Sequence, residues 1–319
     1  MIEANGLTKR YGDKLAVDGL SFRVRPGLVT GFLGPNGAGK STTMRLILGL
    51  DAPTASRAAV HGGAYNELKA PLREVGSLLD AEAAHGGRTA YNHLLCLAQS
   101  NHLPRRRMAE VLEMVGLGPV AGERVRGFSL GMRQRLGIAS AMLGDPGVLI
   151  FDEPMNGLDT QGIRWIRNLM KELASEGRTV FVSSHLMGEM ELTADHLIVI
   201  GRGRLIADTS MSNFIQRNSK GFTLVRSPQG EKLKSVLKSK GAHVQLDPKG
   251  AWRVSGPDAT TIGDMAAEQH ITLHELTPRF SSLEEVYTQM THASVEYRGS
   301  ARVAGPSSRI DDPKRGVNP

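Results

Sequence analysis

The chain has 319 residues, of which 40% are hydrophobic, and its formal net charge of +7 comes from 39 Lys and Arg against 32 Asp and Glu. This length predicts about two domains, the lone Cys96 excludes an internal disulfide and a Cys-based metal cage, and no apolar run approaches the ~18 residues that span a bilayer. The first residues lack the pattern of a secretory signal, so we expect a cytoplasmic protein, and the scattered basic charge favours solvated segments over a nucleic-acid-binding stripe.

The first predicted elements are two short strands, near Ile2–Thr8 and Leu20–Val24, which form an antiparallel pair ahead of an α/β core. A short apolar strand over Leu28–Leu33 follows the turn at Pro26 and Gly27. The residues Thr43–Leu50 then have the spacing of a helix.

The middle of the chain is predicted to be largely helical over about 85–135. Apolar residues recur at helical spacing over Thr89–Asn101 and Arg105–Val115, with Thr89 as a plausible N-cap. We therefore expect a helical subdomain inserted into the α/β core.

After this insert, helices alternate with continuous apolar strands. A helix runs from Leu130 to Leu143, the strand Val148–Phe151 follows, and a helix over about 161–175 leads into the strand Thr179–Ser183. This alternation predicts a buried parallel sheet, and a hairpin is expected to turn at 201–203.

Beyond Ser219 the order of predicted elements changes to βαββαβ followed by a helix, which suggests a small ferredoxin-like α+β domain over 219–295. The strands are predicted at Phe222–Val225, His243–Leu246, Ala251–Val254 and Ile271–Glu275, and the helices at Glu231–Lys238, Ala259–Glu268 and Leu283–Met290. Residues 296–319 mix Gly, Pro, Ser and charged residues with no apolar period, so we expect a disordered tail.

The most informative motif is a complete phosphate-binding loop between a predicted strand and a predicted helix. It consists of Gly34, Pro35, Asn36, Gly37, Ala38, Gly39, Lys40, Ser41 and Thr42. The glycines let backbone N–H groups converge on an oligophosphate. Lys40 supplies a positive charge for the β and γ phosphates, and the Ser41 hydroxyl is placed to ligate Mg²⁺. The motif predicts binding of a nucleoside triphosphate.

Two adjacent carboxylates, Asp152 and Glu153, follow the strand Val148–Phe151, at the end where open α/β sheets place their chemistry. Asp152 is expected to orient Mg²⁺, and Glu153 to polarise the water that attacks the γ phosphate. The strand Thr179–Ser183 delivers His185, which is placed to contact the γ phosphate.

A second anion site is predicted at Ser129, which is a suitable N-cap for the helix that begins at Leu130. The phosphate loop of the same subunit has no evident need for it. The site therefore suggests a second subunit.

Taken in order, these segments resemble the ATP-binding subunit of an ABC transporter over roughly residues 2–218. The resemblance implies a P-loop NTPase core with a mixed sheet and a helical subdomain, so we expect an ABC-type domain over 1–218. By the same resemblance, 34–42 is the Walker A loop, 148–153 the Walker B strand and 129–132 the signature segment.

Three further residues take their roles from this resemblance. Asp159 is the last residue of the D-loop, 156–159. His185 is the switch histidine, and Tyr11 occupies the position whose aromatic ring stacks on adenine. For Tyr11 the alternative is a surface aromatic at the end of a strand.

The chain departs from the family pattern at two places. The signature reads Phe-Ser-Leu-Gly-Met where the family has Leu-Ser-Gly-Gly-Gln, so Ser129 and Gly131 are kept while Leu130 and Met132 differ. We expect phosphate contact to survive, because it depends on the Ser hydroxyl and backbone donors. Asp80 stands where the family has Gln, and its carboxylate can hold Mg²⁺ or water but cannot donate a hydrogen bond as an amide does.

The resemblance implies a two-subunit clamp with ATP and Mg²⁺ as its ligands. Each ATP is expected to be held by Lys40, Ser41 and Thr42 of one subunit and capped by Ser129 and Gly131 of the other. The partners are expected to be a second copy or a related ATPase subunit and an integral membrane permease, with no nucleic acid. The chain would then lie on the inner face of the plasma membrane and drive export of a drug, antibiotic, peptide or lipid.

Two alternatives stay open at this point. A soluble ABC-type ATPase could act on the ribosome or on nucleic acid, although only one set of motifs is present and no long coiled coil separates them. The C-terminal region could bind a regulatory ligand, or it could stabilise the dimer or contact the permease. The sequence does not identify the cargo.

Overall fold

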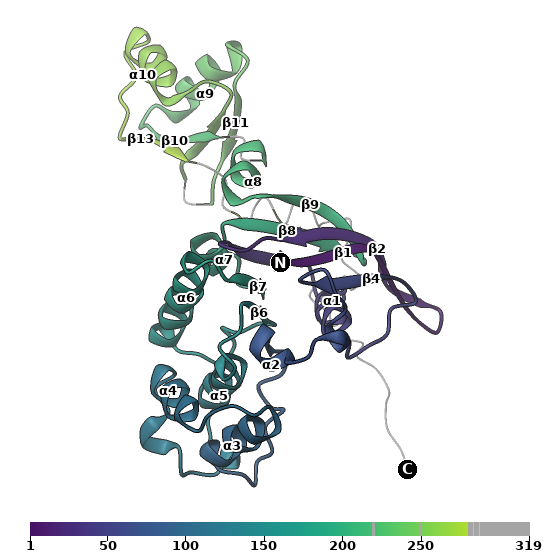
Figure 1. Ribbon diagram of the computed structural model, residues 1–319. Coiled ribbons are helices and arrows are strands. Elements are labelled where there is room, and N and C mark those ends of the chain that lie inside the picture. Colours follow the sequence, from purple (N-terminus) through teal and green to yellow (C-terminus); the bar gives the residue numbers. More distant parts are fainter. Residues whose placement is uncertain (219–220, 249, 280–282, 284–286, 288–319) are drawn as a thin grey trace, which may run out of the picture.

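The computed structural model describes residues 1–218, 221–248, 250–279, 283 and 287. A three-stranded and a six-stranded sheet lie at the centre, the helices α3 and α4 lie at one end, and a small domain lies beyond α8 at the other (Figure 1). The division of the chain at 218 and 295 stays a prediction. The expected tail and all but two residues of the helix expected at Leu283–Met290 lie outside the described residues.

The six-stranded sheet is parallel except at one edge, where β9 pairs antiparallel with β8. In sheet order the strands are β5 (Val75–Leu78), β6 (Val148–Phe151), β7 (Thr179–Ser183), β3 (Val29–Leu33), β8 (His196–Gly201) and β9 (Arg204–Ser210). Every residue of β3, β6 and β7 is buried. The continuous apolar strands therefore predicted a buried parallel sheet correctly.

A second sheet is antiparallel and covers part of the first. Its order is β2 (Lys14–Val24), β1 (Ile2–Tyr11) and β4 (Ala55–Val60), so the predicted antiparallel pair is confirmed and is longer than expected. The rings of Phe22, Phe32 and Phe181 lie 4.9–5.7 Å apart and join β2 to the six-stranded sheet. The strand β4 was not predicted, because its first three residues are exposed and its sequence lacks an apolar alternation.

The helices surround this core. They are α1 (Lys40–Ile47), α2 (Pro71–Glu74), α3 (Ala90–Ser100), α4 (Arg106–Met114), α5 (Leu130–Met142), α6 (Thr160–Ser175), α7 (Met187–Thr193) and α8 (Met211–Asn218). Short 3-10 turns occupy Tyr65–Glu67, Gly118–Val120 and Val125–Gly127. The predicted helical subdomain is present, and Thr89 caps α3 by accepting a hydrogen bond from the Asn92 amide at 3.1 Å. No described helix has both the length and the apolar character needed to cross a bilayer.

The small domain has the ferredoxin-like order that the sequence suggested. Its elements are β10 (Phe222–Arg226), α9 (Gly230–Ser239), β11 (His243–Leu246), β12 (Trp252–Ser255), α10 (Ala259–Glu268) and β13 (Glu275–Arg279). The four strands pair antiparallel in the order β11-β12-β10-β13. This is the arrangement of a split βαβ fold.

The last strand of this domain was predicted four residues too early. Ile271 is buried in the domain core but follows α10 as a loop residue, and its amide bonds the Ala266 carbonyl at 2.8 Å. Thr272 is held by the Gln229 side chain at 2.9 Å. An apolar alternation in a packed loop therefore imitated a strand, and β13 begins only at Glu275.

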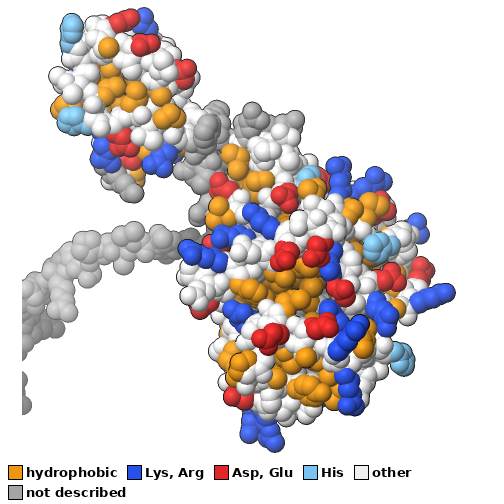
Figure 2. Space-filling view, turned by 60° about the vertical axis from the view of Figure 1, so that its left-hand side comes forward, with side chains coloured by type: hydrophobic (Ala, Val, Ile, Leu, Met, Phe, Trp, Pro, Cys, Tyr) orange, Lys and Arg blue, Asp and Glu red, His pale blue; other side chains and the backbone are white. Residues whose placement is uncertain are grey.

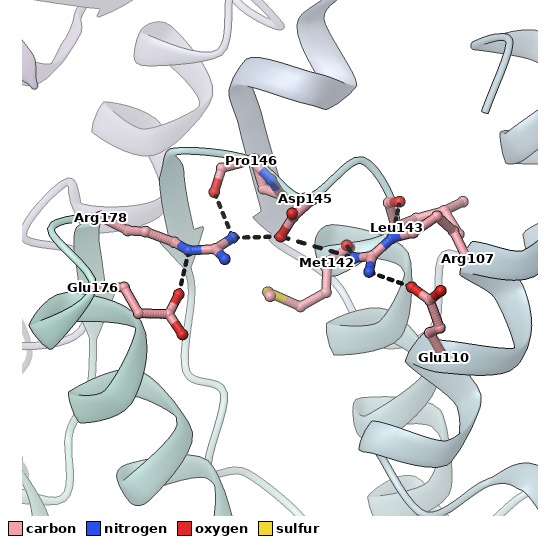
Figure 3. A network of polar contacts seen from close by, with 8 residues as sticks. All are labelled: Arg107, Glu110, Met142, Leu143, Asp145, Pro146, Glu176 and Arg178. Atoms are coloured by element: carbon pink, nitrogen blue, oxygen red, sulfur yellow. Dashed lines mark hydrogen bonds and ion pairs between the residues drawn. The ribbon is translucent and has the colours of Figure 1, made fainter. Parts of the chain in front are cut away.

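A polar network fixes the C-terminal end of α5 to the start of β7 (Figure 3). Arg178 donates to Asp145 at 2.7 Å, to the Pro146 carbonyl at 3.1 Å and to Glu176 at 2.9 Å. On the other side, Arg107 donates to the Met142 carbonyl at 3.0 Å and lies 3.8 Å from Asp145. These contacts join α4, the end of α5 and the central sheet.

Replacing Arg178 with Met is expected to lower the free energy of unfolding by about 1–3 kcal/mol, because the Pro146 carbonyl and the Asp145 carboxylate lose a charged donor. Arg164→Met, at an exposed position of α6, is the matched control. It should change the free energy of unfolding by less than ~0.5 kcal/mol. Thermal unfolding of both variants measures the difference. Equal melting temperatures would show that the network adds nothing to stability.

Candidate functional site

A cavity of about 700 Å³ lies where β3 and β6 end. Its wall brings together many of the predicted residues: Tyr11, Pro35, Asn36, Gly37, Ala38, Gly39, Lys40, Ser41, Thr42, Asp80, Asp152 and Glu153. The carboxyl ends of parallel strands meet at one edge of a sheet, which is why residues far apart in sequence share this wall.

The phosphate loop has a preformed backbone. Gly37 and Gly39 have φ values of 81° and 102°, which side chains rarely adopt. A Cβ on Gly39 would also lie 2.5 Å from the Ala16 carbonyl oxygen. The turn between β8 and β9 supports the loop, because the Gly203 amide donates to the Ala38 carbonyl at 3.0 Å. The loop backbone is thus held in place by its neighbours and by its own hydrogen bond from the Ala38 amide to the Pro35 carbonyl at 3.0 Å.

Lys40 is buried at the start of α1, and its ammonium donates to the Gly34 carbonyl at 2.6 Å. Burial lowers the pKa of Lys40, while the nearby carboxylates Glu153 and Asp152 oppose this shift. A bound polyphosphate would add negative charge and favour the ammonium form. The predicted helix began too late, at Thr43, because the left-handed Gly39 places its N-terminus at Lys40.

The two carboxylates after β6 are held by the neighbouring strand β7. The Ser183 hydroxyl donates to Asp152 Oδ1 and accepts a hydrogen bond from the Glu153 amide at 3.0 Å. The Asp152 amide donates to the Leu78 carbonyl at 2.8 Å. Ser183 was missed by the sequence analysis, although a polar residue at the end of a buried strand is a usable signal.

Three further contacts hold Glu153. Its carboxylate lies 2.7 Å from His185 Nδ1 and accepts the His185 amide at 3.2 Å. Its carbonyl accepts the side chain of the buried Gln134 at 3.1 Å, and its φ is 51°. His185 itself does not line the cavity. Gln134 is a second contact that the sequence analysis missed, and it comes from the helix α5.

Tyr11 is partly exposed at the rim of the cavity, where polar contacts fix its ring. Its hydroxyl donates to Asp51 Oδ2 at 2.9 Å, and Arg45 donates to the same oxygen at 2.7 Å. The ammonium of Lys9 lies 4.8 Å from the ring centroid. The hydrogen bond from Arg45 lowers the pKa of Asp51, whereas partial burial and the Asp51 contact raise the pKa of Tyr11.

The oxygen donors in the cavity suit a magnesium ion. The Ser41 hydroxyl and the carboxylates of Asp152 and Asp80 all line the wall, and hard oxygen ligands are those that Mg²⁺ prefers beside substrate phosphates. One oxygen of Asp80 accepts the Glu82 amide at 2.8 Å, which leaves the second available. Within the described ranges, no group of three or more His, Cys, Asp or Glu could hold a metal ion by itself.

Five predicted residues lie outside the cavity wall: Gly34, Ser129, Gly131, Asp159 and His185. Ser129 caps α5 as predicted and accepts the Met132 amide at 3.2 Å, and Gly131 follows in the first turn. Asp159 caps α6 by accepting the Gly162 amide at 2.7 Å. Of the signature segment, Leu130 lines the cavity, whereas Ser129 and Gly131 lie outside it.

Known proteins share both this fold and this sequence. Residues 17–156 match the family model described as ABC transporter. The chain is 40% identical over 234 residues to the bacitracin transport ATP-binding protein BcrA of Bacillus licheniformis, and the match covers 72% of this chain and 76% of that protein. The chain belongs to the ABC transporter ATP-binding proteins.

Two other likenesses extend this result. The uncharacterized ABC transporter ATP-binding protein YhcH of Bacillus subtilis (strain 168) is 33% identical over 305 residues, covering 93% of this chain and 97% of that protein. The dimeric structure of MJ0796, described as a bacterial ABC transporter cassette, has a TM-score of 0.61 and 25% identity, covering 66% of this chain and 99% of that one. The chain is an ABC ATPase with a P-loop core.

Residues 221–284 match a domain of unknown function, DUF8746.

Replacing Gly39 with Ala is expected to weaken ATP binding by at least ~10-fold, because the new Cβ would meet the Ala16 carbonyl at 2.5 Å and displace the loop. Gly27→Ala is the matched control, since Gly27 has a φ of 77° but no atom within 4 Å of an added Cβ. Titration with a fluorescent ATP analogue measures both affinities. Equal losses in the two variants would attribute the effect to backbone strain alone.

Proposed function

We propose that this ABC ATPase sandwiches two ATP molecules with a second copy or a related subunit and drives export through a separate membrane permease. The observation that carries the proposal is the half site: the signature residues Ser129 and Gly131 lie outside the cavity formed by the phosphate loop of their own chain. An identical or related subunit can supply the missing half.

In this proposal, the base and the phosphates of ATP are held at opposite ends of the cavity. The ring of Tyr11 stacks on adenine at the rim, while Lys40 and the loop amides hold the phosphates. Ser41 and Asp152 would hold Mg²⁺, with Asp80 as a further ligand, and the ion would neutralise phosphate charge. Ser129 and Gly131 of the other subunit cap the γ phosphate from the far side.

Glu153 is proposed to accept the proton of the attacking water. Its contact with His185 at 2.7 Å and the Ser183 bond to its amide orient the carboxylate. His185 would also contact the γ phosphate, and Asp159 would contribute to the paired site of the dimer. Hydrolysis would then reopen the dimer, and this cycle would drive the permease.

The exporter assignment is supported by the relatives. One of them is named a bacitracin transport protein, and export of a drug, antibiotic, peptide or lipid fits that name. The ATPase would then lie against the inner face of the plasma membrane beside its permease. On the face shown in Figure 2, Lys and Arg are interspersed with Asp and Glu, which does not favour a nucleic-acid partner.

Affinity purification tests this assignment directly. Tagged Glu153→Gln protein is purified from detergent-solubilised cells with ATP and Mg²⁺, and the associated proteins are identified by mass spectrometry. A stoichiometric polytopic membrane protein supports the exporter subunit and identifies the permease. Ribosomal or DNA-associated proteins in its place would contradict the proposal.

Replacing Glu153 with Gln is expected to lower ATP turnover by ~10²- to 10⁴-fold while ATP binding persists, because the amide cannot accept the proton of the water. Glu82→Gln is the matched control: Glu82 lines the same cavity and pairs with Arg133 at 3.2 Å, so turnover should change by less than ~3-fold. Steady-state phosphate release and ATP titration measure the two quantities. Unchanged hydrolysis in the Gln variant would refute the role of Glu153 as base.

Replacing Tyr11 with Ala is expected to weaken ATP binding by ~10-fold or more, since the stacked base loses its platform. The affinity for inorganic tripolyphosphate, which has no base, should stay unchanged. Asp51→Asn should weaken binding of ATP but not of tripolyphosphate, and by less than Tyr11→Ala does. The ring of Tyr11 is still present in this variant and loses only the Asp51 carboxylate that accepts its hydroxyl. Tyr91→Ala, at an exposed position of α3, is the control. Equal losses for ATP and tripolyphosphate would contradict a role in base binding.

A further inference from the structure

The first turn of α5 packs on the D-loop of the same chain at Gly157. Leu130 is 47% exposed, yet one side of its side chain lies directly on the bare Cα of Gly157. A Cβ at Gly157 would lie 2.4 Å from Leu130 Cγ and 2.5 Å from Leu130 Cδ2. The leucine therefore occupies the space that any side chain at 157 would need.

The contact is reciprocal. A Cβ at Gly131 would lie 2.8 Å from the Gly157 carbonyl oxygen, so the D-loop backbone in turn occupies the space above α5. Gly157 has a φ of 72°. This backbone conformation directs its carbonyl toward Gly131 while its Cα faces Leu130. Leu130 and Gly131 on one side and Gly157 on the other thus form an interlocked contact, which we call the signature lock.

Other contacts tie the same helical turn to the ATP cavity. Gln134 donates to the Glu153 carbonyl at 3.1 Å, and Arg133 pairs with Glu82 at 3.2 Å beside Asp80. The beginning of α5 is therefore connected to Glu153, to Glu82 and to Gly157 of the D-loop. Among these connections, only the signature lock involves residue 130, one of the two places where the signature departs from the family pattern.

We propose that Leu130 is a positioning residue: seated on Gly157, it fixes the signature turn to the D-loop, so that Ser129 and Asp159 meet the partner subunit as one rigid unit. This proposal rests on the ATP-dependent dimer proposed above. Ser129 precedes the lock by one residue, and Asp159 follows it by two. Both residues cap helices, α5 and α6, so the lock also fixes the relative position of two helix N-termini.

The physical reason for a leucine is rigidity at the beginning of a helix. A glycine at the first helical position would leave this turn free to rotate about its backbone. The branched side chain of Leu130 packs on Gly157 and limits that freedom. The opposite side of the leucine side chain remains exposed. The lock therefore orders Ser129 and Asp159 before dimerisation. Less conformational entropy is then lost when the dimer forms.

A double-mutant cycle in the Glu153→Gln background tests the lock. Gly157→Ala forces Leu130 from its seat, Leu130→Ala removes the seated side chain, and the double variant does both. Each single change is expected to weaken ATP-driven dimerisation by ~10-fold. The double change should also weaken it by ~10-fold, and not by ~100-fold, because both single changes remove the same contact. Sedimentation velocity with ATP measures dimerisation. Because Leu130 also lines the ATP cavity, the ATP affinity of each monomer is measured separately, and dimerisation is compared at saturating ATP.

A control separates the lock from backbone strain. Gly177→Ala places a side chain at a φ of 89° with no atom within 4 Å, and should leave dimerisation unchanged. Losses that multiply to ~100-fold in the double variant, or an unaffected Leu130→Ala variant, would overturn the lock. Leu130→Ala also guards against misfolding, because it removes atoms from a half-exposed side chain.

The parent variant distinguishes the two proposals. If Glu153→Gln protein fails to dimerise with ATP, the proposed dimer is wrong, and the lock is then judged in the monomer by hydrogen exchange. Leu130→Ala should raise the exchange rate of amides in both 130–133 and 156–159, because each segment loses its packing partner. A rate that stays unchanged in 156–159 would overturn the lock independently of dimerisation.

Discussion

The geometry of the ATP site depends on the hydroxyl of Ser183. It donates to Asp152 and accepts the amide of Glu153, so one group orients both carboxylates that follow β6. The hydroxyl can do this because β6 and β7 pair in parallel with Phe151 opposite Val182. The fully buried strands keep this register fixed. The strand register of the sheet thus determines how the two carboxylates are oriented.

The same sheet explains which predicted residues share the cavity. The phosphate loop and the carboxylates follow strands, and the strand ends hold them around one cavity. Ser129 and Asp159 instead cap helices that begin after loops, and their contacts in this chain are with the backbone of α5 and α6. Residues placed by the strand ends therefore share one cavity, while Ser129 and Asp159 lie outside it.

The sequence predicted those parts that depend on local chemistry. The strands at Val148–Phe151 and Thr179–Ser183 matched, because a buried parallel strand is continuously apolar. The phosphate loop was found because its glycines must permit unusual backbone. Ser183 and Gln134 were missed, since their importance comes from neighbours far away in sequence. The strand at Glu275–Arg279 was misplaced because burial of Ile271 in a loop follows the same apolar pattern as burial in a sheet.

The small domain is joined to the ATPase core on both of its sides. Before it, Phe214 of α8 is buried in the hydrophobic cluster of the core, and after it Leu283 is buried in the same cluster. The amide of Leu283 donates to Glu191 of α7 at 3.2 Å. Since α7 begins two residues after His185, the connection at Leu283 reaches the segment that follows His185. A domain held at both ends is constrained far more than one attached by a single linker, because each closed connection removes orientations that a free end would sample.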